Sequence, residues 1–149
     1  MHGSADFAVS QLCAELVGLP GIIADSGVVT DGRYTVYIVD GDEAVRDSLA
    51  AFLEAEGYAT QCFEACKDFH VTRLPTDDAC LLLELHLPRH GADNLLACLS
   101  ERARQLPVIV MSGAARYTEV RSLRAGAAAF IEKPLNSEEL VRTLRKIFA

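Results

Sequence analysis

Short apolar runs alternate with amphipathic segments along most of the chain, from Tyr34 onward. The run from Thr35 to Val39 predicts a strand, and the segment from Glu43 to Glu56 carries apolar residues at helical spacing. Gly57 is expected to end this helix. Because the same alternation repeats toward the C-terminus, the pattern indicates a parallel α/β sheet.

The remaining segments bring the count to five strands, each followed by a helix. The later predicted strands are 58–62, 80–85, 108–111 and 128–132, and the later predicted helices are 66–73, 93–104, 118–124 and a last helix after residue 136. Asn136 and Glu139 form a capping-box pattern at the start of that last helix. The order of elements predicts an open, doubly wound sheet with helices on both faces.

The first part of the chain has a different pattern, so we divide the sequence into an N-terminal extension, 1–33, and a domain, 34–149. Phe7 to Leu19 is predicted to form an amphipathic helix, and Val28 to Val36 a hairpin. Two interpretations of the helix remain open. Its apolar stripe either covers part of the domain or serves as a docking or dimerising arm.

Polar residues stand at the carboxyl ends of the predicted strands. They are Asp40, Gly41 and Asp42 after the first strand, Glu84 at the third, Ser112 and Gly113 at the fourth, and Lys133 at the fifth. Glu84 is unusual because it ends a nearly continuous apolar run of the kind that is buried on both faces. Since the carboxyl ends of parallel strands meet at one edge of the sheet, these residues predict a functional site there.

The composition favours a single compact domain and argues against a membrane protein and a nucleic-acid-binding protein. A chain of 149 residues with 50% hydrophobic residues is enough for one compact domain. The sequence has no apolar run of about 18 residues and no signal-peptide pattern, so we expect a cytoplasmic protein without a membrane segment. The net charge of -7 argues against direct nucleic-acid binding by this chain, because phosphate contacts need clustered Lys and Arg.

The cysteines are odd in number and scattered among apolar neighbours. They are Cys13, Cys62, Cys66, Cys80 and Cys98. This distribution favours reduced thiols over a disulfide framework. Cys62 with Cys66, and His86 with His90, are alternative zinc ligands, but neither spacing forms a paired set. We therefore expect core and loop residues at these positions, with His86 and His90 in solvent.

Four segments, in this order and spacing, resemble the receiver domain of two-component response regulators, closest to the nitrogen-fixation transcriptional regulators. They read VYIVDGDEAVRDSL, LLLELHLPRHGADNLL, PVIVMSGAA and LRAGAAAFIEKPL. The similarity covers 34–149, and the EKP that follows an AGA-containing helix is its most specific signal. The resemblance implies a flavodoxin-like sheet with strand order 2-1-3-4-5 and a signalling role without enzymatic activity.

In that family, two acidic residues after the first strand and an aspartate at the end of the third hold Mg²⁺. The third-strand aspartate accepts a phosphoryl group from a histidine kinase. By this resemblance Asp40 matches the first acidic position, Gly41 stands at the second, and Glu84 stands at the position of the phosphoryl acceptor. Ser112 and Phe130 match the two switch positions, which are the hydroxyl residue that responds to phosphate and an aromatic residue. Lys133 matches the lysine that pairs with the phosphoryl oxygens.

A glutamate at the acceptor position changes the expected chemistry. Its additional methylene moves the carboxylate by about 1.3 to 1.5 Å, whereas Mg²⁺ requires near-ideal octahedral geometry. A displacement of that size costs on the order of a hundredfold in rate. Gly41 also removes one cation-binding carboxylate, for which Asp42 is a candidate replacement. We therefore expect either no cofactor or weak Mg²⁺ held by Asp40, Asp42 and Glu84.

The leading hypothesis is an atypical receiver, or pseudo-receiver, in which a Glu84–Lys133 pair takes the place of phosphate and magnesium. Such a domain acts as a protein-interaction module in a phosphorelay. The alternative is a receiver that a histidine kinase still phosphorylates and that controls a DNA-binding output domain missing from this chain. The structural interpretation of Glu84 is a buried carboxylate whose charge Lys133 balances. Ser112 is a weak candidate nucleophile, because no histidine is placed to activate it.

The resemblance also implies the partners. They are a histidine kinase or a downstream regulator, and a second copy of the chain. Family members commonly form homodimers through the face that corresponds here to 118–124, 128–131 and 137–148.

Overall fold

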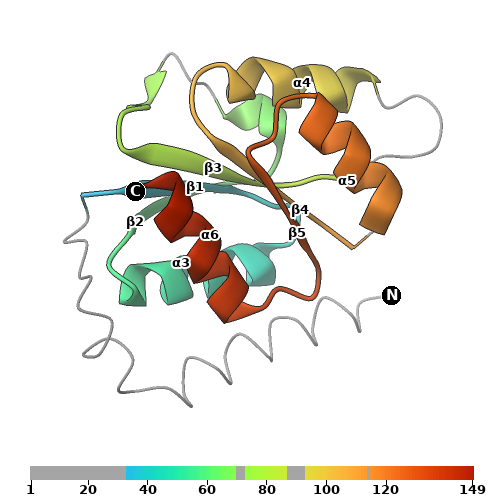
Figure 1. The fold of residues 1–149 in the computed structure, drawn as a ribbon. Coiled ribbons are helices and arrows are strands. Elements are labelled where there is room, and N and C mark those ends of the chain that lie inside the picture. The colour runs from blue at the N-terminus through green and yellow to red at the C-terminus, as the bar shows by residue number, and fades with distance from the viewer. Residues whose placement is uncertain (1–32, 70–72, 87–92, 114) are drawn as a thin grey trace.

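The computed structural model describes residues 33–69, 73–86, 93–113 and 115–149. Within them the chain forms a parallel sheet of five strands in the order β2-β1-β3-β4-β5. This confirms the predicted α/β class and strand order (Figure 1). The predicted helix from Phe7 to Leu19 and the part of the predicted hairpin before Arg33 lie outside the described residues, so the division of the chain at residue 33 stays a prediction.

The observed elements follow the predicted alternation closely. The strands are β1 (Thr35–Val39), β2 (Ala59–Phe63), β3 (Ala79–Glu84), β4 (Val108–Ser112) and β5 (Ala129–Glu132). The helices are α3 (Glu43–Ala55), the 3-10 turn η1 (Cys66–Asp68), α4 (Asp93–Ala103), α5 (Ala115–Arg124) and α6 (Ser137–Ile147). In the described part of the chain no helix is long and apolar enough to cross a membrane.

The predicted helix 66–73 is the element that differs from expectation, and of it 70–72 lie outside the described residues. Only the short turn η1 forms at its start, so the described chain has four α-helices. The turn stops because Phe69 adopts an extended backbone and is completely buried. Its ring lies 5.0 Å from that of Tyr37 in the core. The burial of this ring therefore overrides the local helical pattern.

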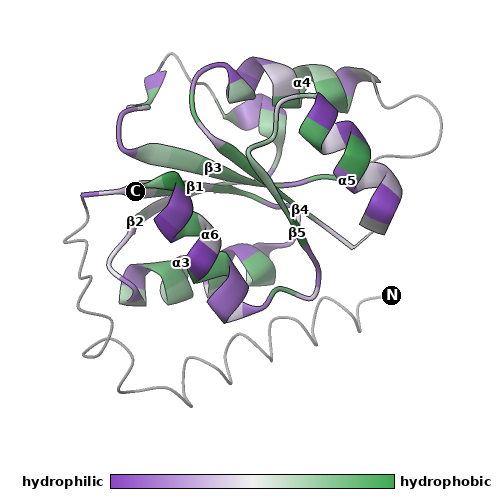
Figure 2. Cartoon of the chain, viewed as in Figure 1, coloured by the Kyte–Doolittle hydropathy of each residue, from purple (hydrophilic) through white to green (hydrophobic). Residues whose placement is uncertain are grey.

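The sheet is covered on both faces (Figure 1). Helices α3 and α6 lie on one face, and α4 and α5 lie on the other. Alternate residues of the strands supply two separate cores, as Leu82 does for the α3–α6 side and Leu81 and Leu83 do for the opposite side. Figure 2 shows the apolar strands between helices that carry both hydrophilic and hydrophobic residues. The central strands are thus buried on both faces, as their unbroken apolar runs predicted.

Caps define the ends of the two helices that border the sheet on the α3–α6 side. The Asp42 side chain accepts hydrogen bonds from backbone amides at the start of α3, and Gly57 follows α3 with φ +96°, where glycine is favoured. At α6 the Asn136 side chain accepts a 3.0 Å hydrogen bond from the Glu139 amide, which confirms the predicted cap. The starts of both helices are therefore fixed by side chains next to strand ends.

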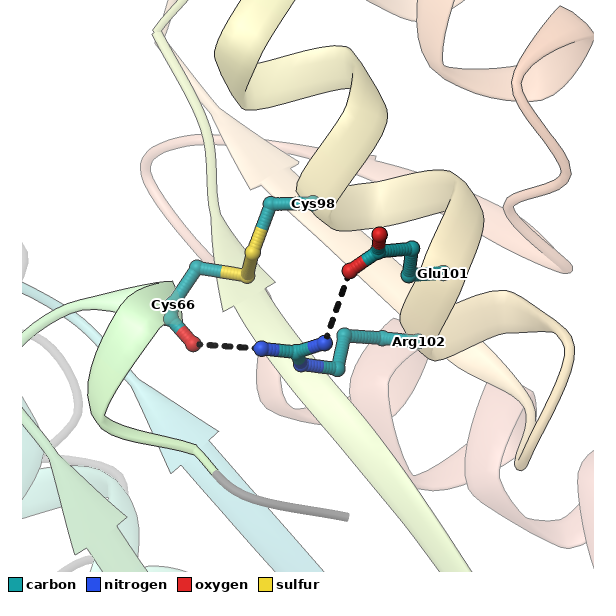
Figure 3. The surroundings of a disulfide bond; sticks show 4 residues. All are labelled: Cys66, Cys98, Glu101 and Arg102. Carbon is teal, nitrogen blue, oxygen red and sulfur yellow. Dashed lines mark hydrogen bonds and ion pairs between the residues drawn. A yellow bond between two sulfur atoms is a disulfide. The ribbon is translucent and has the colours of Figure 1, made fainter.

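The expectation of reduced cysteines is wrong for one pair, because Cys66 and Cys98 form a disulfide with a Cα–Cα distance of 6.7 Å (Figure 3). The fold causes this pairing, since α4 packs beside η1 although the two cysteines are 32 positions apart. The bond also removes Cys66 from the zinc alternative. Cys62 and Cys80 are free thiols, and burial raises the pKa of Cys80 to about 12.

Candidate functional site

Three charged residues from separate strands meet at the carboxyl edge of the sheet. Asp40 directly follows β1, Glu84 ends β3, and Lys133 directly follows β5. The Lys133 ammonium donates a 3.1 Å hydrogen bond to Asp40 Oδ2 and a second hydrogen bond to Glu84 Oε2. Since β4 lies between β3 and β5, the long lysine side chain reaches past a strand to join the two carboxylates.

Asp40 is the most deeply buried of the three, with 1% of its surface exposed. Its Oδ1 accepts a 2.9 Å hydrogen bond from the Asp42 amide, and its backbone oxygen accepts a 2.6 Å hydrogen bond from Arg46 Nη1. Burial raises the pKa of the Asp40 carboxyl, and this outweighs the opposing effects of the Asp42 amide and the Lys133 charge. Asp40 is therefore the carboxylate for which ionisation costs most at this site.

Glu84 and Lys133 are less enclosed, since their side chains are 20% and 19% exposed. Burial opposes ionisation of Glu84, but the hydrogen bond and charge of Lys133, aided by His86, outweigh it and lower the pKa of Glu84. Burial likewise opposes the Lys133 charge, but Glu84 and Asp40 raise the pKa of Lys133. The pair is thus held in its charged form, with His86 Nε2 at 3.8 Å from Glu84 Oε2.

Asp42, the candidate replacement for a missing metal ligand, uses its carboxylate elsewhere. Its Oδ1 accepts hydrogen bonds from the amides of Ala44 at 2.9 Å and Val45 at 3.4 Å. Asp42 therefore contacts Asp40 through its backbone amide, while its carboxylate caps α3. Among the residues that the structure describes, no three side chains of the metal-binding types are gathered into one group.

Gly41 faces open space. A side-chain carbon there would meet no atom within 4 Å apart from its chain neighbours. The backbone at this position can therefore carry a Cβ atom without a close contact. This property makes Gly41 useful for testing the site.

The two predicted switch residues, Ser112 and Phe130, lie on β4 and β5. Ser112 is completely buried at the end of β4, and its backbone oxygen accepts a 2.9 Å hydrogen bond from the Lys133 amide. Phe130 is half-buried and packs against the core beneath α4 and α5. The sequence analysis did not identify Arg46, which contacts the backbone at the end of β1. Its position one turn into α3 could have indicated this contact.

The fold and the acid–lysine site define a receiver domain, and comparison with known proteins agrees. The profile of the response regulator receiver domain matches residues 36–145. The chain belongs to this family, whose receiver domains are non-catalytic signalling modules that interact with histidine kinases. This confirms the family resemblance and the expectation that the chain is not an enzyme.

Individual relatives include transcriptional regulators. The chain is 32% identical over 111 residues to the transcriptional regulatory protein FixJ of Azorhizobium caulinodans, which covers 74% of this chain and 53% of FixJ. It is 37% identical over 111 residues to the C4-dicarboxylate transport regulator DctR of Rhodobacter capsulatus, covering 72% of this chain and 56% of DctR. The crystal structure of FixJ-N matches with a TM-score of 0.63 and 31% identity, over 77% of this chain and 93% of that structure. The chain thus spans about half the length of the curated relatives that it matches.

Proposed function

We propose that this receiver works as a protein-interaction module in which the Glu84–Lys133 ion pair takes the place of phosphate and magnesium. The pair fixes the domain in one signalling conformation and releases it from control by a kinase. The observation that carries the proposal is the Lys133 ammonium, which donates hydrogen bonds to Glu84 and to Asp40. This proposal takes Glu84 as the residue at the phosphoryl-acceptor position.

The electrostatics of the site support this function. Phosphorylation of Glu84 requires its carboxylate to turn toward the phosphoryl donor, whereas Lys133 already donates a hydrogen bond to Oε2. Breaking this contact leaves the ammonium of Lys133 and the carboxylate of Glu84 partly buried and unpaired, which costs free energy. Because the ammonium supplies positive charge between two carboxylates, the site has less need of a cation.

The shortage of cation ligands supports the same conclusion. Gly41 provides no carboxylate, and Asp42 is engaged as a helix cap. Two carboxylates remain, and both contact Lys133. Mg²⁺ needs near-ideal octahedral geometry, so a site that offers two lysine-paired carboxylates is expected to bind it weakly.

Phosphorylation by a small donor tests the proposal directly. The chain is incubated with acetyl phosphate and Mg²⁺, and its intact mass is measured with and without hydroxylamine, which cleaves acyl phosphates. We expect the wild-type chain to gain no stoichiometric phosphoryl group. The double variant Gly41→Asp with Glu84→Asp restores both carboxylates in the expected geometry, and we expect it to be phosphorylated on the order of a hundredfold faster.

Glu132→Asp is the matched control, because Glu132 also ends a strand but is exposed and outside the trio. This variant should behave like the wild-type chain. A gain of one hydroxylamine-sensitive phosphoryl group per wild-type chain would contradict the proposal and favour a receiver that remains under kinase control.

We further propose that α5 forms the centre of the surface through which the domain binds its partner, a second copy of the chain in the simplest case. Tyr117, Val120 and Leu123 are spaced three residues apart along α5 and are 40%, 41% and 45% exposed. Arg121 lies over the Tyr117 ring, 5.4 Å from its centroid, and holds it in place. Exposed apolar stripes with a polar rim are typical of binding surfaces.

A further inference from the structure

The disulfide between η1 and α4 joins two elements that follow different strands (Figure 3). We propose that Cys66 and Cys98 form a thiol–disulfide exchange site, at which a low-molecular-weight disulfide oxidises the pair and thereby ties α4 to η1. This inference does not depend on whether Glu84 accepts phosphate.

We expect both partners of this site to be open to small reagents, because Cys66 and Cys98 are only partly buried residues. Cys80, in contrast, is completely buried in the core of the α3–α6 side. Because exchange requires access to the sulfur atom, the pair is expected to react while Cys80 stays inert.

The exchange proceeds in two balanced steps. The thiolate of one cysteine attacks the small disulfide, forming a mixed disulfide and releasing one small thiolate. The thiolate of the other cysteine then attacks the protein sulfur of that mixed disulfide, which forms the Cys66–Cys98 bond and releases the second small thiolate. In total the two protein thiols lose two protons and two electrons, and the small disulfide is reduced to two thiols.

Arg102 supplies a non-covalent link between the same two elements. From α4, its Nη2 donates a 3.5 Å hydrogen bond to the backbone oxygen of Cys66, and its Nη1 pairs with Glu101 at 3.4 Å (Figure 3). This contact does not need the disulfide. It is therefore expected to keep Cys66 and Cys98 within reach of each other after reduction, even though α4 gains some freedom, so that the second step of oxidation is intramolecular and fast.

The position of the bond gives it a structural consequence at the candidate site. The stretch between Cys66 and Cys98 contains β3, which ends at Glu84. Helix α4, which carries Cys98, is the next described helix after Glu84. Oxidation is therefore expected to restrict the position of α4, and reduction to let α4 move relative to the sheet.

Alkylation mapping of the full chain tests the exchange site. A Cys13→Ser background removes a competing thiol outside the described residues. The reduced protein is treated with oxidised glutathione or buffer, alkylated without denaturation, and analysed by peptide mass. We expect labels on Cys66 and Cys98 only in the reduced sample, a linked Cys66–Cys98 peptide after glutathione disulfide, and no label on Cys80 in either. Equal labelling of the pair in both samples, or stable glutathione adducts without the linked peptide, would overturn the proposal.

Hydrogen exchange over 93–104 measures the structural consequence. We expect reduction to speed amide exchange in this segment by about tenfold, with Cys66→Ser and Cys98→Ser each matching the reduced protein and Cys62→Ser matching the oxidised one. Arg102→Gln should slow re-oxidation by glutathione disulfide without preventing it. If exchange over 93–104 is the same in the oxidised and reduced wild-type chain, the bond does not restrict α4, and the proposed tether is wrong.

Discussion

At the scale of the residue, Lys133 determines the electrostatic balance of the site. Two carboxylates lie within hydrogen-bond reach of its ammonium, and one of them, Asp40, is almost completely buried. Removing a neighbouring charge from a buried pair exposes the desolvation cost of the charge that remains. Lys133 therefore stabilises the fold chiefly because its positive charge balances the two neighbouring carboxylates, Asp40 and Glu84.

We predict that Lys133→Met lowers the free energy of unfolding by about 2 to 4 kcal/mol at pH 7, below the value for a fully buried pair because Lys133 and Glu84 are partly exposed. Urea unfolding followed by circular dichroism measures this change. Lys146→Met, at an exposed position of α6, is the control and should change stability by less than about 0.5 kcal/mol. Equal effects of the two substitutions would show that the ion pair contributes nothing.

The pH dependence follows from the directions of the pKa shifts. The raised pKa of Lys133 gives stability that is present below its ordinary value of 10.5 and is lost as pH rises above it. The lowered pKa of Glu84 gives stability that is present above 4.5 and is lost as pH falls below it. The raised pKa of Asp40 acts oppositely, because acid relieves its burial cost. In Lys133→Met both carboxyls lose the positive charge of the lysine. The difference in the free energy of unfolding between the variant and the wild-type chain should therefore shrink as pH falls from 7 toward 5.

At the scale of the element, parallel-sheet geometry explains why much of the site was predictable. Asp40, Glu84 and Lys133 end or follow strands whose apolar runs are evident in the sequence, and parallel strands bring such ends together. The role of Asp42 was less evident, because an aspartate before a helix is equally suited to a cap and to a cation. In the structure the Asp42 carboxylate caps α3.

We predict that Asp42→Ala lowers the free energy of unfolding by about 1 kcal/mol, because two amides at the start of α3 lose their acceptor. Asp42→Asn keeps an acceptor oxygen and removes the charge, so its stability should stay within a few tenths of a kcal/mol of wild type. Thermal unfolding of both variants checks the prediction. If Asp42→Asn is as unstable as Asp42→Ala, the charge of Asp42, rather than its capping oxygen, is what matters.

Two features of the fold could not be predicted, because both depend on contacts between residues that are distant in sequence. The turn η1 is short because Phe69 packs against Tyr37 from a neighbouring strand. The pairing of Cys66 with Cys98 depends on how α4 sits beside η1. The local sequence pattern gives no information on either contact. The number and spacing of the cysteines alone favoured reduced thiols.

At the scale of the whole molecule, the two faces of the sheet have different roles. Helices α3 and α6 close a core that is continuous with the strands, whereas α5 on the other face leaves an apolar stripe exposed. The layering followed from the alternation of elements, and the strand order from the resemblance to receiver domains. The exposed stripe required the structure, because periodicity alone does not tell which apolar residues of a short helix find a partner within the chain.

We predict that this stripe supports self-association, and that Val120→Glu raises the dissociation constant of the dimer at least tenfold, as expected when a charge is placed in an apolar interface. Analytical ultracentrifugation over a range of concentrations measures it. Leu95→Glu is the matched control, because Leu95 is 39% exposed on α4, outside the proposed surface. A monomeric wild-type chain at all concentrations would exclude a second copy as the partner.

One further consequence concerns the ends of the domain. The ring of Tyr34, at the start of β1, stacks on that of Phe148, after α6, with centroids 4.5 Å apart. Figure 1 shows the end of the chain close to the beginning of β1. The chain therefore enters β1 and leaves α6 at one corner of the domain, so that the position of either end constrains the other.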